Sequence, residues 1–265
     1  MSASRFAKRS LLTLCFVACA IGLAGQTQTA TGQFQPQVGQ AGKDVVWVPS
    51  PQALVDKMLD MAKVTPQDFV MDLGSGDGRT VITAAKRGVR AMGVEYNPDM
   101  VQLSKNAAAK EGVSERAEFV QADLFKTDLS KATVITMFLL PTINMQLRPT
   151  LLNLKPGTRI VSNTFDMEDW QPDAEATIGS PDCTSWCKAM LWIVPAKAQG
   201  KWQTPQGPLV ITQTFQMVSG TLGPTPIKGK IVGDEISFNA GSAQYSGRIS
   251  GSTITGTNWT ASRAN

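Results

Sequence analysis

A glycine-rich turn directly after a short apolar stretch is the feature that most constrains this chain. Phe69 to Leu73 has the composition of a buried strand, and it runs into Asp72-Leu73-Gly74-Ser75-Gly76-Asp77-Gly78. Glycine has no Cβ atom, so the three glycines let the backbone turn tightly and let a ligand approach the peptide groups. A helix expected from about Thr80 to Arg87 would offer its free N–H groups to that ligand. The sequence therefore predicts a strand, a ligand-binding turn and a helix in succession.

Strand-like and helix-like segments alternate after this turn. The further stretches predicted to be strands are Ala91 to Val94, Phe119 to Ala122, Thr133 to Leu140, Thr158 to Ser162 and Met190 to Val194. The signals expected for helices are Ser50 as a cap before Pro51, Asn97-Pro98 at the start of a helix that reaches Gly112, and a helix near Ile143 to Leu154 that Pro149 interrupts. Strands and helices at this spacing predict an α/β fold with a doubly wound, mostly parallel sheet.

Carboxylates stand where the first three strands are expected to end. Asp72 lies in the first strand, Glu95 follows it by 23 residues, and Asp123 comes after the third strand. The carboxyl ends of parallel strands meet at one edge of a sheet, so these acids are expected to face one ligand. At the position of Glu95 a carboxylate can accept both hydroxyls of a ribose. Ordinary structural roles stay open as well: a solvated strand end for Glu95 and a helix cap for Asp123.

The glycine spacing separates two classes of nucleotide site. A dinucleotide-binding turn reads G-x-G-x-x-G, whereas the third glycine here comes one residue early and an acid precedes the first by two residues. The pattern resembles motif I of class I S-adenosylmethionine (SAM)-dependent methyltransferases, in which the turn faces the amino-acid tail of SAM. This resemblance implies a seven-stranded Rossmann-like methyltransferase sheet, methyltransferase activity and SAM as the cofactor.

The same resemblance assigns the cofactor site. The residues it implies are Asp72, Gly74, Ser75, Gly76, Gly78, Glu95, Tyr96, Asp123 and Leu124. Glu95 would hold the ribose and Asp123 would accept from the adenine amino group, with Leu124 or Phe125 against the ring. Tyr96 follows Glu95, and strand alternation points it to the other face of the sheet, where it would pack.

Later motifs narrow the resemblance further. Val48-Pro49-Ser50-Pro51 is similar to the entry segment of ATP-synthase c-subunit-type lysine methyltransferases and their bacterial relatives. The stretches that resemble the same bacterial group are Leu139-Leu140-Pro141, Leu147-Arg148-Pro149, Leu154-Lys155-Pro156-Gly157 and Phe165-Asp166-Met167. The resemblance covers about Val45 to Pro195 and implies a protein lysine as the methyl acceptor. However, Leu139-Leu140-Pro141-Thr142 replaces the Asn/Asp-Pro-Pro-aromatic motif of many amino methylases, so the acceptor stays open.

The residue types available limit the chemistry. The chain has no histidine, which excludes a Cys/His zinc site and leaves proton removal to a carboxylate, a lysine of lowered pKa, or one of the two tyrosines, Tyr96 and Tyr245. Asn163 and Asp166 follow the fifth strand and would reach a substrate or serve as loop residues. Alignment of donor and acceptor is the main requirement for methyl transfer, so a strong base is optional. We assign no catalytic residue and no metal.

The N-terminal segment has the pattern of an export signal. Arg5, Lys8 and Arg9 precede the apolar stretch Leu11 to Leu23, which is short for a membrane span. We expect a signal peptide or a membrane anchor over residues 1–24, hence an exported protein that is periplasmic or membrane-anchored, with a cytoplasmic location left open. Membrane contact is expected through this segment alone, if it is retained. Without its three charges the chain is nearly neutral, which argues against a nucleic-acid partner.

Two cysteines remain beyond that signal. Cys183 and Cys187 flank Thr184-Ser185-Trp186, and an exported protein would oxidise them to a disulfide. The alternative is two unrelated thiols.

The C-terminal part differs in composition and in its pattern of apolar residues. From about Gly200 the chain is glycine-rich with strand-like alternation, and Gly229, Ile231, Gly233 and Ile236 are echoed eighteen residues later by Gly247, Ile249, Gly251 and Ile254. That period is the size of a hairpin and predicts a small antiparallel β meander or partial barrel, unless it arose by chance. The predicted organisation is a disordered linker at 25–44, a methyltransferase domain at 45–197, a connector near Lys197 to Gln206, and a small all-β domain at 207–265.

Two other functions compete with a methyltransferase. An exported nucleoside- or SAM-binding scaffold without turnover would keep the fold and place its function in the β tail. A nicotinamide-dependent oxidoreductase would need a dinucleotide turn and a catalytic His or Tyr-x-x-x-Lys pattern, which the sequence lacks.

Overall fold

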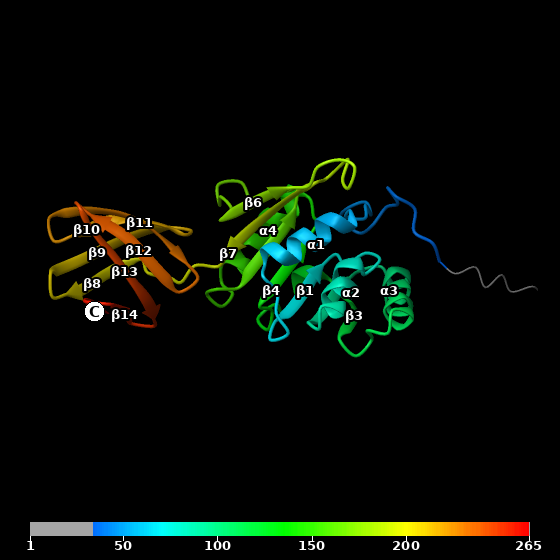
Figure 1. Cartoon of the computed structure of the whole chain (residues 1–265), viewed down its shortest axis with the longest axis horizontal. Coiled ribbons are helices and arrows are strands. Elements are labelled where there is room, and N and C mark those ends of the chain that lie inside the picture. Colours follow the sequence, from blue (N-terminus) through cyan, green and yellow to red (C-terminus); the bar gives the residue numbers. More distant parts are fainter. Residues whose placement is uncertain (1–33, 265) are drawn as a thin grey trace, which may run out of the picture. The chain divides into compact units, whose positions relative to one another are not determined.

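The computed structural model describes residues 34–264 of the chain. The predicted signal or anchor at 1–24 and the first part of the predicted linker lie outside the described residues. Contacts group Phe34–Asn265 into one compact unit, which contains an open sheet followed by a barrel (Figure 1). Among residues 34–264, the helices all lack the length and apolar character that a membrane crossing needs.

The open sheet has seven strands in the order β3-β2-β1-β4-β5-β7-β6. Its parallel strands are β1 (Phe69–Leu73), β2 (Arg90–Glu95), β3 (Ala117–Gln121), β4 (Val134–Met137) and β5 (Arg159–Asn163). Two antiparallel strands complete it, β6 (Ala174–Thr177) and β7 (Lys188–Ile193). The predicted doubly wound, mostly parallel sheet is confirmed. Strand β6 escaped prediction because its Ala-Glu-Ala-Thr sequence is mostly exposed and has no apolar run.

Helices cover both faces of this sheet. They are α1 (Gln52–Met61), α2 (Arg79–Lys86), α3 (Pro98–Lys110) and α4 (Pro141–Leu151), with a short 3-10 helix η1 (Leu124–Lys126). Val70 packs with α1, α2 and α3, whereas its neighbour Met71 packs with α4, because successive strand residues face opposite sides. The strand order turns back between β1 and β4, and ligands of open α/β sheets bind in the crevice at such a switch point.

Two predicted helix signals are wrong in detail. Pro51, not Ser50, precedes the first residue of α1, and the Ser50 hydroxyl accepts a hydrogen bond from Asn163 Nδ2 at 2.9 Å instead of capping the helix. Pro149 does not interrupt α4, which begins at Pro141 and continues to Leu151. It stands two residues before the helix end, so α4 lacks one i to i−4 hydrogen bond there and continues for only two more residues.

The segment before α1 is ordered where the sequence predicted a disordered linker. Ala41 and Val46 form a bridge, and the Gly39 and Trp47 backbones are joined by an N–H to carbonyl bond of 2.8 Å. Gly42 N–H donates to the Val45 carbonyl at 2.9 Å, which closes a tight turn. The prediction failed because this order comes from contacts with the sheet edge, and the segment has no apolar period of its own.

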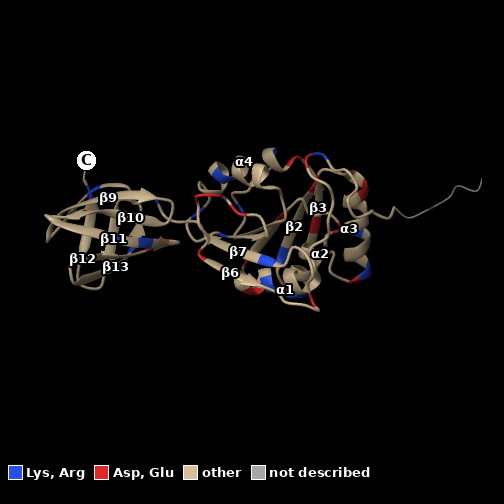
Figure 2. Cartoon of the chain, turned by 90° about the horizontal axis from the view of Figure 1, so that it is seen from above, with Lys and Arg blue, Asp and Glu red and all other residues tan. Residues whose placement is uncertain are grey.

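The C-terminal part closes into an antiparallel barrel of eight strands. They are β8 (Gly200–Thr204), β9 (Gly207–Thr214), β10 (Met217–Leu222), β11 (Thr225–Val232), β12 (Glu235–Ala240), β13 (Ala243–Ser250), β14 (Thr253–Gly256) and β15 (Thr260–Arg263). The predicted small antiparallel β structure is confirmed, and full closure leaves no free sheet edge. Charged residues are sparser along its strands than along the open sheet and its helices (Figure 2).

The eighteen-residue period corresponds to two successive hairpins. Ile231 pairs with Ile236 across β11 and β12, and Ile249 pairs with Ile254 across β13 and β14. All four side chains are buried in the barrel core. The shared glycines of the two turns, Gly233 and Gly251, adopt left-handed φ angles of 60° and 57°.

The barrel begins earlier than predicted. β8 lies within the expected connector, where Trp202 is fully buried and pairs with Leu209 of β9. The polar residues around it had suggested a linker, but alternate side chains of a barrel strand face solvent. Hydrogen bonds also tie the barrel to the preceding segment, from Gln213 Nε2 to the Ala196 carbonyl at 3.0 Å and from Gln216 Nε2 to the Gln171 carbonyl at 2.7 Å.

Candidate active site

A pocket of about 530 Å³ opens at the carboxyl ends of the parallel strands. This volume falls in the range of roughly 300 to 1,000 Å³ that is usual for small-molecule sites. The predicted site residues that line it are Asp72, Gly74, Ser75, Gly76, Glu95, Tyr96, Asp123 and Leu124. The structure therefore brings together all but one of the residues that the glycine motif and the strand ends indicated.

Gly78 is the exception, because it stands outside the pocket wall. A Cβ atom there would lie 2.7 Å from Phe119 Cε1 and 2.8 Å from Ser104 Cβ. The third glycine thus allows α2 to pack closely on its neighbours, with a left-handed φ of 80°. Gly78 therefore has a packing role next to the pocket, and its predicted part in cofactor binding stays a prediction.

Glu95 is fixed by the glycine turn itself. Its Oε2 accepts from the Gly76 N–H at 3.0 Å, and its Oε1 accepts from the Asn97 N–H at 2.9 Å. Each carboxylate oxygen can accept a further hydrogen bond, so the side chain is held in place without losing its capacity for a ribose. The bond from the Gly76 N–H also means that Glu95 stabilises the conformation of the glycine turn, a role that the sequence did not reveal.

Asp72 is buried and joins β1 to β4. Its Oδ1 accepts from the Thr136 hydroxyl at 2.6 Å. Burial, opposed by the hydrogen bond from Thr136 and assisted by the charges of Asp77 and Glu95, raises the pKa of the Asp72 carboxyl from its ordinary 3.8 to about 7. Near neutral pH this carboxyl is therefore only partly ionised.

Asp123 has two partners at the end of β3. Its Oδ1 accepts from the Phe125 N–H at 3.0 Å, which caps η1, and its Oδ2 pairs with Lys43 Nζ at 3.1 Å. The hydrogen bond from Lys43 and that from the Phe125 N–H lower the pKa of this carboxyl. Both the predicted capping alternative and a place in the pocket wall are thus found. The predicted contact with an adenine amino group stays a prediction.

Tyr96 does not pack on the opposite face as alternation suggested. Strand β2 ends at Glu95, so the alternation no longer applies, and the ring is 52% exposed beside the pocket. Lys43 Nζ lies 5.1 Å from the centre of the Tyr96 ring, within reach of a cation–π contact.

The pocket residues that sequence reasoning missed come first from the segment before α1. Gln40 to Ser50 lines one side of it. A Cβ atom on Gly76 would lie 2.6 Å from Trp47 Nε1, so the glycine lets the indole rest directly on the turn. The signal available was weak: a Gly-Lys-Asp sequence typical of a tight turn, just ahead of an isolated tryptophan.

Three aromatic side chains form the second missed group. Phe138 follows β4, Phe165 follows β5, and Trp186 belongs to the loop before β7. The ring centres are 5.9 Å apart for Phe138 and Phe165, 6.0 Å for Phe138 and Trp186, and 5.5 Å for Phe165 and Trp186. These residues, the aromatic trio hereafter, are far apart in sequence and meet because β4, β5 and β7 are neighbours in the sheet.

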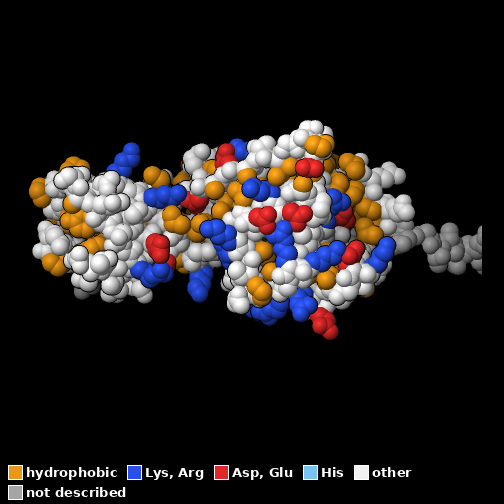
Figure 3. Space-filling model, viewed as in Figure 1, with side chains coloured by type: hydrophobic (Ala, Val, Ile, Leu, Met, Phe, Trp, Pro, Cys, Tyr) orange, Lys and Arg blue, Asp and Glu red, His pale blue; other side chains and the backbone are white. Residues whose placement is uncertain are grey.

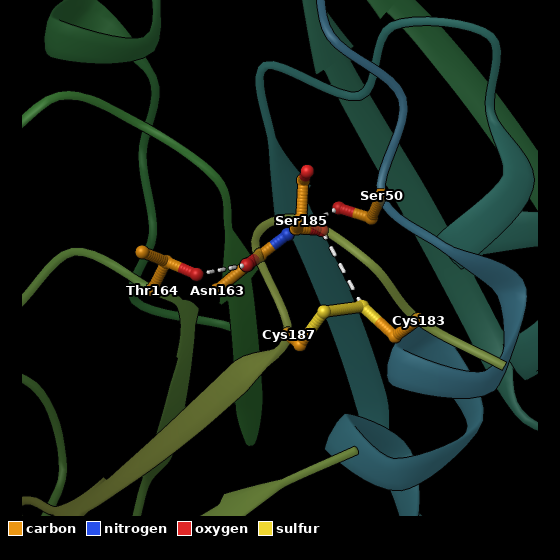
Figure 4. The surroundings of a disulfide bond; sticks show 6 residues. All are labelled: Ser50, Asn163, Thr164, Cys183, Ser185 and Cys187. Carbon is orange, nitrogen blue, oxygen red and sulfur yellow. Dashed lines mark hydrogen bonds between the residues drawn. A yellow bond between two sulfur atoms is a disulfide. The ribbon is translucent and has the colours of Figure 1, made fainter. Parts of the chain in front are cut away.

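Asn163 and Asp166, proposed to reach a substrate, serve the loops instead. Asn163 is fully buried and links Ser50 to Thr164, donating to the first and accepting from the second at 2.8 Å (Figure 4). Asp166 accepts from the Glu168 N–H at 3.2 Å. Neither lines the pocket, and Tyr245 belongs to barrel strand β13.

The predicted disulfide between Cys183 and Cys187 is confirmed (Figure 4). It closes a short loop that carries Trp186, whose φ of 58° is unusual for a residue with a side chain. The end of this loop is held by the sheet, since the Ile178 N–H donates to the Cys187 carbonyl at 2.9 Å.

The charges around the pocket favour a cationic ligand. The carboxylates that line it are Asp44, Asp72, Asp77, Glu95 and Asp123, against two cations, Lys43 and Arg79. Both cations are engaged: Lys43 with Asp123, and Arg79 with Asp77 at 2.6 Å. Acids in excess over bases in a concave site attract positive charge.

The comparisons with known proteins agree with this geometry. The family profile described as ANTKMT methyltransferase domain matches residues 72–174. A protein-lysine N-methyltransferase of Saccharolobus islandicus (strain REY15A) is 47% identical over 131 residues, which are 48% of this chain and 81% of that protein. The chain belongs to this family of methyltransferases.

Two further relatives extend the comparison. The lysine N-methyltransferase of the ATP synthase c-subunit from Homo sapiens is 35% identical over 156 residues, 57% of this chain and 66% of that protein. A crystal structure of an RNA methyltransferase from Salinibacter ruber, in complex with S-adenosyl-L-homocysteine, has a TM-score of 0.53 at 42% identity and covers 57% of this chain and 96% of that one. The chain is thus a class I SAM-dependent methyltransferase, which replaces the scaffold and oxidoreductase alternatives.

The residues of this methyltransferase fit SAM. Gly74 and Gly76 turn the backbone with left-handed φ angles of 73° and 54°, and a Cβ atom on Gly74 would lie only 3.1 Å from Leu139 Cδ2. A side chain there would fill the cradle that the cofactor needs. The excess of carboxylates suits a ligand that carries a sulfonium and an ammonium group.

Proposed function

We propose that this methyltransferase transfers the methyl group of SAM to the ε-amine of a lysine in a protein. The observation that carries the proposal is the division of the pocket into two halves. Acids at the ends of β1, β2 and β3 form one half, and the aromatic trio at the ends of β4, β5 and β7 forms the other. A long alkyl amine suits the second half, because aromatic rings attract an ammonium group and pack on the methylene groups that carry it.

The relatives support a lysine acceptor. Those from Saccharolobus islandicus and Homo sapiens are both named lysine N-methyltransferases. The Salinibacter ruber protein is named an RNA methyltransferase, so the acceptor has to be decided by experiment. On the face seen in Figure 3, acidic and basic side chains are intermixed. The absence of a nucleic-acid partner stays part of this proposal.

The residues of the chain have three tasks in this reaction. SAM, when bound, supplies a methyl group on a positively charged sulfur. Glu95 and Asp123 are proposed to hold the ribose and the adenine amino group, while the glycine turn leaves room for the amino-acid tail. The acceptor amine attacks with its lone pair, so its proton must first pass to solvent or to a pocket carboxylate. The aromatic half then excludes water and aligns the amine.

Blocking lysines tests the acceptor. Cell protein from the source organism would be divided into a native sample and one with lysines chemically acetylated, and each would be incubated with the full chain and methyl-labelled SAM. We expect label in the native protein, located on lysine by mass spectrometry, and none in the acetylated sample. Equal label in both samples would refute a lysine acceptor. Glu95→Ala serves as the enzyme control and should label the native sample much more weakly than the unmodified enzyme does.

We also propose that the protein is exported and that residues 1–24 direct it. The Cys183–Cys187 disulfide supports this, because disulfides persist mainly in oxidising compartments. A reporter fused after residue 42 should appear outside the cytoplasm, and the same fusion without residues 1–24 should stay inside. Retention of the first fusion in the cytoplasm would refute the proposal.

A further inference from the structure

The aromatic trio has the arrangement of a cation-binding site. Its ring centres are 5.5 to 6.0 Å apart, so the rings contact one another, and a group that binds over them contacts more than one ring. Aromatic faces carry partial negative charge and attract ammonium groups within about 6 Å of the ring centre. Trp186 is 44% exposed although it is a large apolar side chain, which leaves its ring accessible from the pocket.

Acids adjoin the trio in the sequence, and the cations nearby are paired. Asp166 directly follows Phe165, and Asp182 directly precedes Cys183; both are exposed. Lys188, the nearest cation along the chain, is paired with Glu175 at 2.9 Å. The two cations that line the pocket, Lys43 and Arg79, are both paired with acids, so an incoming ammonium group meets no unpaired cation among the described pocket residues.

Trp186 is held in place by its loop. Its left-handed φ of 58° is costly for a residue with a side chain and persists only where the surroundings enforce it. Cys183 and Cys187 close the loop on either side, and the Thr164 N–H donates to the Lys188 carbonyl at 2.7 Å just beyond it. The disulfide and the sheet together place the indole against Phe138 and Phe165.

We propose that Phe138, Phe165 and Trp186 form the subsite for the alkylammonium group of the acceptor, and that the Cys183–Cys187 disulfide positions Trp186 in it. The inference rests on the proposed function, because that proposal places an amine acceptor in the aromatic half of the pocket. The trio binds the cation on arrival and again as the methylated product. The indole is the ring that selects charge, because tryptophan is the strongest of the aromatic partners.

A pair of matched probes tests the subsite directly. N-acetyl-trimethyllysine methylamide carries a quaternary nitrogen, and its isostere with carbon in place of that nitrogen has the same shape without charge. Each would be titrated into the full chain saturated with S-adenosylhomocysteine, with binding followed by nuclear magnetic resonance. We expect the charged probe to bind about 5- to 30-fold more tightly, the range that cation–π contacts supply.

Variants separate the rings from the rest of the surface. Trp186→Leu should reduce the preference for the charged probe to about twofold or less, whereas Trp186→Phe keeps a ring and should retain most of it. Cys183→Ser with Cys187→Ser should also lower the preference, as should reduction of the unmodified protein. Met217→Ala, at a barrel position of 46% exposure, is the control and should change nothing. Circular dichroism would verify the fold of each variant.

The outcomes distinguish this inference from the proposed function. Equal affinity for the two probes, or an undiminished preference in Trp186→Leu, would overturn the subsite even if lysine is methylated. A clear preference that Trp186→Leu removes supports it, and this holds whether or not the lysine-blocking experiment succeeds. If the charged probe is preferred but lysine is not methylated, the subsite would serve an alkylammonium acceptor other than protein lysine.

Discussion

Asp72→Asn should remove a pH dependence of stability that one buried carboxyl imposes. The folded pKa of about 7 lies above the ordinary value of 3.8, so the folded protein binds more protons than the unfolded chain between these values. Its contribution to stability is therefore fully present below about pH 4 and is lost as the pH rises through about 7. Asparagine keeps the shape and an acceptor for the Thr136 hydroxyl, but it does not titrate.

The magnitude follows from the two pKa values. At 1.36 kcal/mol for each pKa unit, the unfolding free energy of the wild type should fall relative to Asp72→Asn by about 2 to 3 kcal/mol from pH 5 to pH 8. Urea unfolding of both proteins at the two pH values measures this. Asp128→Asn is the control: the Ser130 N–H lowers the pKa of Asp128, so its titration is complete below pH 5. An unchanged difference between wild type and Asp72→Asn would show that Asp72 ionises normally.

Three further predictions follow from the site. Glu95→Ala should weaken SAM binding about ten- to a hundredfold in calorimetric titration, because two charge-assisted bonds to the ribose and the acceptor of the Gly76 N–H are lost together. Asp123→Ala should weaken it less. Unchanged affinity in Glu95→Ala would contradict the ribose assignment. Gly76→Ala should destabilise the protein by at least about 1 to 2 kcal/mol in urea unfolding, since alanine disfavours the left-handed φ of Gly76. Adding Trp47→Ala should recover only the part of this loss that comes from the clash with the indole. If the unfolding free-energy changes of the two substitutions were strictly additive, the indole would not rest on the turn. Residues 43–197 alone should still bind SAM, and loss of binding by a folded truncation would show that the barrel or Gln40 to Gly42 is needed for the site.

The sequence predicted the cofactor half of the site because its signals are local. Asp72 and the glycines form one continuous motif, and Glu95 and Asp123 stand where apolar stretches end. A parallel sheet then brings these ends to one edge whatever the details of packing. What the motif did not reveal is that the Glu95 carboxylate is bound to the Gly76 N–H, which depends on the conformation of the turn.

The acceptor half lay beyond sequence reasoning for a physical reason. Phe138, Phe165 and Trp186 each follow or precede a strand with no shared motif, and only the pairing of β5 with both β4 and β7 brings them together. Similarly, Lys43 was assigned to a disordered linker because order there comes from a long-range ion pair with Asp123. The disulfide, in contrast, was predictable from two cysteines four residues apart.

The fate of the methyl label tests the central claim most directly. The full chain would be incubated with methyl-labelled SAM and a cell extract that contains both protein and RNA, and the product would be divided between protease and ribonuclease treatment. A lysine methyltransferase predicts label that protease releases, that ribonuclease leaves intact and that amino-acid analysis finds in methylated lysine. Label that ribonuclease releases, or protein label on a residue other than lysine, would contradict it.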